Sequence, residues 1–100
     1  MSVTPTAVTV VAEMLAKPGR EEDLRRELLD MVEKTRTEEG CVQYDLHVAL
    51  DEPGRFVFYE NWASPETLKA HSQSAHLKAF GEKAPELVAE RRVLRYARIA

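Results

Sequence analysis

The sequence predicts an α+β domain in which a four-stranded antiparallel sheet carries its helices on one face. Two observations lead to this fold class. Apolar residues switch between a period of two and a helical period along the chain, and the resulting order is strand, helix, strand, strand, helix, strand. That order is the split βαβ, or ferredoxin-like, arrangement. One hundred residues suffice for a single domain, 1–100, in which we expect residues 1–6 to form a loose leader.

The first strand is predicted over Ala7 to Ala16, which is rich in β-branched residues and ends at the turn signal Lys17-Pro18-Gly19. Apart from two residues it is apolar on both faces. Helical spacing follows from Arg20 to about Glu39, and Gly40 is well placed to end the helix. One stripe of this helix is predicted to be buried: Leu24, Leu28, Met31, Val32 and Thr35.

A hairpin comes next. The segment from Cys41 to Leu50 alternates, with Tyr44 on its more apolar face and Cys41 on its more polar face. The turn is assigned to Asp51 to Gly54, and Arg55 opens the second strand.

This second strand, which ends at Trp62, has an unusual inward face. Glu60 shares that face with Phe56, Phe58 and Trp62, whereas Tyr59 lies on the opposite face. Carboxylates are seldom buried without a partner. Glu60 is therefore a candidate site residue.

Two helix starts follow the strand. Ser64 reads as an N-cap with a proline after it, and the helix that begins there carries His71. A second start at Ser74 carries His76. Two of the three histidines thus lie close in sequence to Glu60.

The last strand is predicted over Arg91 to Ile99, which alternates again, after a short turn that begins at Pro85. Four arginines cluster near this strand. We interpret them as solvated charges along a strand edge: Arg91, Arg92, Arg95 and Arg98.

Composition excludes several classes of protein. A net charge of −3 argues against a nucleic-acid binder, because such proteins usually carry a basic patch. The single cysteine, Cys41, forms no intrachain disulfide and fits a reducing cytoplasm, and the histidines and cysteine lack the paired spacings of a zinc site. No export signal and no stretch long enough to span a membrane is recognised.

The first strand also predicts a partner. In an isolated domain the sheet face away from the helices would be wet, yet this strand is apolar on both sides. A second copy packed sheet against sheet would cover that face. We therefore expect a homodimer.

The sequence resembles the antibiotic-biosynthesis monooxygenase family of dimeric α+β barrel proteins, and its quinol-monooxygenase-like members in particular. The resemblance runs from about Val8 to Ile99. It rests on the order and spacing of several pieces: Glu38-Glu39-Gly40-Cys41 with Tyr44, Glu60-x-Trp62, Leu68-x-Ala70-His71, His76 and Phe80.

The resemblance implies a cavity between sheet and helices in which phenols or quinols are oxidised by dioxygen with no metal or flavin. His71 would be the general base, Glu60 would orient it, and His76 could hold the second oxygen. The haem-degrading branch differs at several positions, so haem breakdown is not expected. The remaining pocket residues are expected to line the cavity or donate a hydrogen bond: Trp62, Phe58, Tyr44, Phe80 and Tyr59.

Plainer interpretations stay open at this point. Glu60 and His71 could simply pair and join strand to helix, and His76 could cap its helix from solvent. The same pocket could also serve an isomerase or tautomerase acting on a small carbonyl compound, or a protein that binds a small aromatic molecule without turnover.

Overall fold

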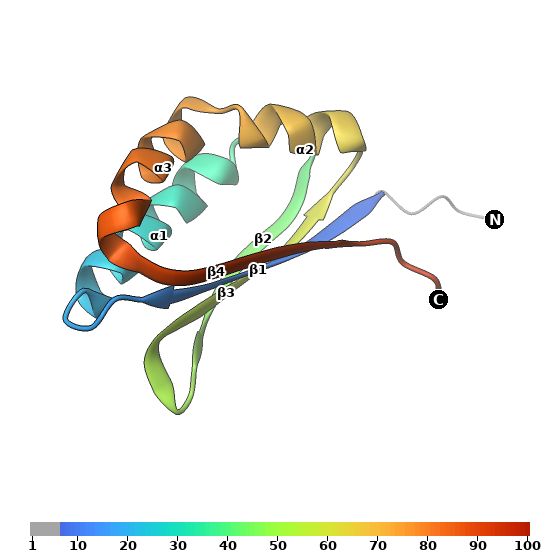
Figure 1. Ribbon diagram of the computed structural model, residues 1–100. Helices are drawn as coiled ribbons and strands as arrows, with labels where there is room; N and C mark the ends of the chain where they lie inside the picture. The colour runs from blue at the N-terminus through green and yellow to red at the C-terminus, as the bar shows by residue number, and fades with distance from the viewer. Residues whose placement is uncertain (1–6) are drawn as a thin grey trace.

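A computed structural model describes residues 7–100 of the chain. It has four strands and three helices in the order β1, α1, β2, β3, α2, α3, β4. The helices form one layer on a single face of the sheet (Figure 1), so the predicted α+β, ferredoxin-like class is confirmed. The expected leader, residues 1–6, lies outside the described residues. The bounds are β1 (Val8–Ala16), α1 (Glu21–Thr35), β2 (Cys41–Ala49), β3 (Glu52–Trp62), α2 (Pro65–Ser72), α3 (Ala75–Leu87) and β4 (Val88–Tyr96).

The sheet has the order β2-β3-β1-β4, and every neighbouring pair is antiparallel. The two inner strands therefore supply most of the floor on which the helices pack. Burial alternates along them as the period of two requires, and on β3 the inward residues are aromatic or acidic. The buried inward residues of β3 are Phe56, Phe58, Glu60 and Trp62.

Helix α1 buries the predicted apolar stripe against this floor, with Leu24 and Leu28 fully buried. Its end differs from the prediction, because the helix stops at Thr35 rather than near Glu39. The four residues that follow form turns, and Gly40 then takes a positive φ of 81°. That left-handed conformation suits glycine, so Gly40 ends the connection rather than the helix.

Helices α2 and α3 begin where the sequence predicts. The Ser64 side chain accepts a hydrogen bond from the Thr67 N–H, and Thr67 reciprocates to complete a capping box. Ser74 caps α3 without such a box: its side chain accepts a hydrogen bond from the Leu77 N–H. The turn expected at Pro85 is wrong, since Pro85 lies inside α3. Only the last turn of the helix follows Pro85. The burial of Leu87 in the core offsets the cost of the backbone hydrogen bond that proline cannot donate.

Two details of the hairpin also differ from the prediction. Strand β3 begins at Glu52, so the turn is shorter than expected. The register between β2 and β3 shifts, with Cys41 opposite Trp62 and Gln43 opposite Asn61. This β-bulge inserts Val42 as an extra residue. Cys41 consequently packs against the core instead of lying on the more polar face.

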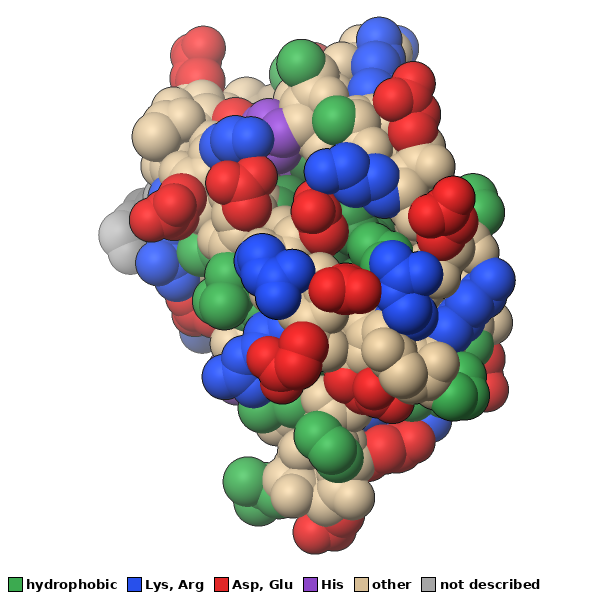
Figure 2. Space-filling model, turned by 90° about the vertical axis from the view of Figure 1, so that its left-hand side faces the viewer, with side chains coloured by type: hydrophobic (Ala, Val, Ile, Leu, Met, Phe, Trp, Pro, Cys, Tyr) green, Lys and Arg blue, Asp and Glu red, His purple; other side chains and the backbone are tan. Residues whose placement is uncertain are grey.

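The outer surface is of mixed charge. Figure 2 shows basic and acidic side chains interspersed on the face seen there, with no large area of one sign. No helix within residues 7–100 has the length and apolar character needed to cross a membrane.

Candidate functional site

A cavity of about 130 Å³ lies between the sheet and the helices. This is comparable to the space of about 150 Å³ that holds benzene in a protein core, so the size of the cavity suits one aromatic ring. The walls are mainly apolar or aromatic, and they include Met14, Met31, Tyr44, Phe58, Leu68 and Leu77. The charged or titratable lining residues besides Tyr44 are Glu60, His71, Arg91 and Arg95.

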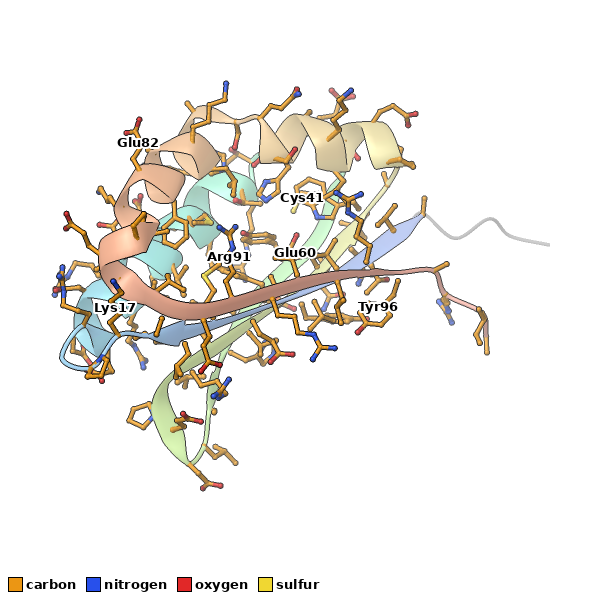
Figure 3. The ribbon with its side chains drawn as sticks, in the orientation of Figure 1. Lys17, Cys41, Glu60, Glu82, Arg91 and Tyr96 are labelled. Carbon is orange, nitrogen blue, oxygen red and sulfur yellow. The ribbon has the colours of Figure 1, made fainter. Side chains whose placement is uncertain are left out.

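Glu60 points from near the end of β3 toward the helix layer (Figure 3). It is only 4% exposed, and its Oε1 accepts a hydrogen bond of 2.9 Å from Trp62 Nε1. Burial raises the pKa of Glu60 to about 7, against the opposing effect of the Trp62 hydrogen bond. A carboxyl group with this pKa can both accept and release a proton near neutral pH.

His71 forms the opposite wall, from the last turn of α2. Its ring lies 4.6 Å from the Trp62 ring, measured between centroids. Its Nδ1 lies 2.8 Å from Glu38 Oε2. Burial lowers the pKa of His71, and the hydrogen bond to Glu38 acts in the opposite direction. At neutral pH we therefore assign a neutral imidazole whose Nδ1–H donates to Glu38, which leaves the lone pair on Nε2.

The carboxylate partner of His71 is thus Glu38, not Glu60 as expected. The Glu60 carboxylate is turned to Trp62 instead. Sequence reasoning missed Glu38 because the helix was predicted to continue through it, whereas it lies in the turns after α1. The available signal was its place in the segment that led to the family resemblance, two residues before Gly40.

His76 contacts the same oxygen of the Glu38 carboxylate as His71 does. Its Nε2 lies 2.8 Å from Glu38 Oε2, and two hydroxyl oxygens lie nearby, Thr35 Oγ1 at 3.1 Å and Ser74 Oγ at 3.4 Å. His76 is not among the residues that line the cavity. The structure therefore brings His76 together with His71 through Glu38, behind the cavity wall.

Glu38, His71 and His76 offer the donor types that zinc and ferrous iron use, and their ligating atoms lie within 4.8 Å of one another. Two ligands on one tetrahedral zinc would be roughly 3.3 Å apart. Both Glu38–histidine distances are 2.8 Å, which matches charge-assisted hydrogen bonds. The trio fits a hydrogen-bonded cluster as it stands, and holding a metal would require Glu38 to move away from both rings.

The predicted aromatic pocket residues fall into three groups. Tyr44 and Phe58 line the cavity. Trp62 and Phe80 are buried in the surrounding core rather than in its lining. Tyr59 is 40% exposed on the face away from the helices, so the expected contact with the pocket is wrong: its position in the β3 alternation is opposite to that of Glu60.

Tyr44 can donate a hydrogen bond within the cavity wall. Its hydroxyl lies 3.4 Å from Met31 Sδ, and its ring stacks at 4.7 Å from Phe58. Burial raises the pKa of Tyr44 well above its ordinary value. The phenol consequently stays protonated across the neutral range.

Comparison with known proteins gives consistent results. The family model described as antibiotic biosynthesis monooxygenase matches residues 7–83. The protein named "Putative monooxygenase YcnE" from Bacillus subtilis is 33% identical over 81 residues, which are 81% of this chain and 85% of YcnE. "Probable quinol monooxygenase YgiN" from Escherichia coli is 33% identical over 87 residues, covering 75% of this chain and 82% of YgiN. The crystal structure of PA3566 from Pseudomonas aeruginosa matches with a TM-score of 0.91 and 33% identity, covering 95% of this chain and 96% of that one.

Proposed function

The chain belongs to the antibiotic biosynthesis monooxygenase family, and from this premise we propose that it oxygenates a small hydroxylated aromatic compound of the quinol type, using dioxygen and no cofactor. The observation that carries the proposal is a ring-sized cavity with a neutral imidazole, His71, and a proton-exchanging carboxyl group, Glu60, in its wall. The resemblance to YgiN supports a quinol as the substrate class.

Removal of a phenol proton is the step that the residues can assist. A phenol is a poor reductant of dioxygen, and its phenolate is a much better one. His71 Nε2 accepts the proton, and the resulting imidazolium is stabilised by the Glu38 carboxylate at Nδ1. General-base assistance of this kind contributes on the order of 10²–10⁴ in rate.

The reaction then balances without an external reductant. The phenolate gives one electron to dioxygen, and the two radicals combine at a ring carbon to form a peroxide. Protonation of the peroxide and loss of the ring C–H proton release water and leave a carbonyl group. A quinol thereby loses four electrons and becomes a hydroxyquinone, with one oxygen atom in the product and the other in water. Glu60 supplies or accepts the protons of these later steps, consistent with its pKa of about 7.

A proton-transfer reaction is the second candidate. An isomerase or tautomerase on a small carbonyl compound would use the same acid–base pair, and the near-neutral pKa of Glu60 favours it as well. Oxygen uptake separates the two candidates, because an isomerase consumes no dioxygen.

The test is an oxygen-electrode screen of monocyclic quinols with the unmodified chain and with His71→Ala. We expect quinol-dependent uptake that falls 10²–10⁴-fold in the variant. His47→Ala is the matched control, since His47 is exposed on β2 and is not a lining residue. Unchanged uptake in a folded His71→Ala protein would refute the role of His71.

We also propose that two copies associate through the open face of the sheet. This face carries the exposed rings of Tyr59 and Tyr96, beside a row of side-chain hydrogen bonds that runs from Thr9 through Asn61 to Gln43. A second copy would cover the rings and retain the hydrogen bonds. A mass equal to one chain in light scattering at micromolar concentration would contradict this.

A further inference from the structure

The wall of the cavity formed by β4 carries two arginines. Residues 91, 93 and 95 alternate toward the helices, and they lie opposite the buried β1 residues Met14, Ala12 and Val10. Figure 3 shows Arg91 in the space between the sheet and the helix layer, as it does Glu60. Arg91 and Arg95 are exposed on the edge strand β4, as expected for solvated edge charges, and they also line the cavity.

Unlike four other arginines, these two guanidinium groups form no ion pair with a carboxylate of residues 7–100. Arg20, Arg26, Arg36 and Arg55 each form an ion pair with a carboxylate. Within residues 7–100, the ion pairs and side-chain hydrogen bonds include neither Arg91 nor Arg95. Each is therefore available to a ligand.

The charge balance of the cavity is positive although the chain carries a net charge of −3. Glu60 is the only carboxyl group among its lining residues in the described part of the chain. Its carboxyl is held by Trp62 and is partly protonated near neutral pH. Two permanent positive charges thus face a site with less than one full negative charge.

We propose that Arg91 and Arg95 form an anion subsite at the cavity, and that the substrate is a monocyclic quinol bearing a carboxylate group. Arginine offers a planar fork of N–H donors that matches a carboxylate. The cavity of about 130 Å³ has room for the ring, with its hydroxyl group at His71 and its carboxylate toward β4. The subsite refines the proposed function and rests on it for turnover, but not for binding.

The first experiment compares 2,5-dihydroxybenzoate with its methyl ester, which has the same ring and no charge. We expect kcat/KM for oxygen uptake to favour the acid by about 10- to 100-fold, the range of one charge-assisted hydrogen bond. Arg91→Gln with Arg95→Gln should bring this ratio close to one. The matched control is Arg92→Gln, because Arg92 lies between them on β4 and alternates to the opposite face, and it should retain the ratio.

The second experiment separates this inference from the proposed reaction. Calorimetric titration with 3-hydroxybenzoate and its methyl ester measures binding of phenols that are not quinols, and it needs no turnover. We expect saturable binding of the acid that the double variant loses. Three results would each overturn the subsite. The unmodified protein could bind acid and ester equally well, the double variant could keep its preference for the acid, or Arg92→Gln could lose binding of the acid to the same extent as the double variant. Acid-selective binding without oxygen uptake would support the subsite and refute the oxygenase.

Discussion

Replacing Glu38 by glutamine tests the part of the site that the sequence did not identify. The change keeps the size of the side chain and removes its charge. The single glutamine oxygen can take the place of Glu38 Oε2, which lies 2.8 Å from both His71 Nδ1 and His76 Nε2 in the native protein, but it carries no negative charge. The substitution therefore exchanges two charge-assisted contacts for two neutral ones.

The magnitude follows from these contacts. A hydrogen bond to a charged group contributes about 1.5–3 kcal/mol and a neutral one about 0.5–1.5 kcal/mol, so the imidazolium formed during catalysis loses at least about 1 kcal/mol of stabilisation. Tenfold in rate corresponds to about 1.4 kcal/mol, and partners that orient a functional histidine typically contribute about 10–100-fold. We expect kcat for quinol-dependent oxygen uptake to fall about 10–100-fold.

The pH profile gives a second readout. His71 must be neutral to act as a base, so the rate rises with pH through its pKa, which lies below the ordinary 6.5. Glu38 raises the pKa of His71 and also that of Glu60. Removing its charge lowers both, and any limb of the profile due to either group moves to lower pH. A purely structural disturbance would lower the rate without moving the limbs in this direction.

The matched control is Glu39→Gln, which makes the same chemical change at an exposed neighbouring position. It should leave both the rate and the profile unchanged. Activity of Glu38→Gln within twofold of the native protein, with His71→Ala strongly impaired, would refute the positioning role of Glu38. Equal losses in the Glu38 and Glu39 variants would refute it as well.

Three other predictions concern stability and metal dependence. The pKa of Glu60 rises from 4.5 to about 7 on folding, so ionisation of Glu60 lowers the stability of the fold as the pH increases through that interval. Glu60→Gln should therefore raise the free energy of unfolding, measured with urea, by up to about 3 kcal/mol at pH 8 and by much less at pH 4. Equal gains at both pH values would contradict this. Gly40→Ala should destabilise the fold by at least about 1–2 kcal/mol, because the positive φ disfavours alanine and the added Cβ would overlap the Thr67 side chain. The control Gly81→Ala, inside α3 with open space around it, should not destabilise the fold. Equal changes in Tm for the two variants would argue against both reasons. A chelator such as EDTA should leave oxygen uptake unchanged, and a loss restored by zinc or ferrous iron would show that the Glu38, His71 and His76 cluster holds a working metal.

Much of the architecture could be predicted because its signals are local. Strand and helix periods repeat within a few residues, and the Ser64 and Ser74 caps act on backbone groups three residues away. The inward face of β3, including Glu60, followed from alternation alone. The errors lie where a local rule competes with a tertiary contact, as at Pro85, which α3 accommodates while Leu87 is held in the core.

Local sequence patterns were enough to predict the order of the elements, the inward carboxyl group on β3 and the histidine on α2 that lines the same cavity. Tertiary structure alone decided the partners. Glu38 and His71 are 33 residues apart, and Arg91 and Arg95 reach the cavity only because β4 pairs with β1. The physical reason is that periodicity tells which face of an element a side chain occupies, whereas the distance between two side chains on different elements depends on how the chain closes its loops and packs its layers.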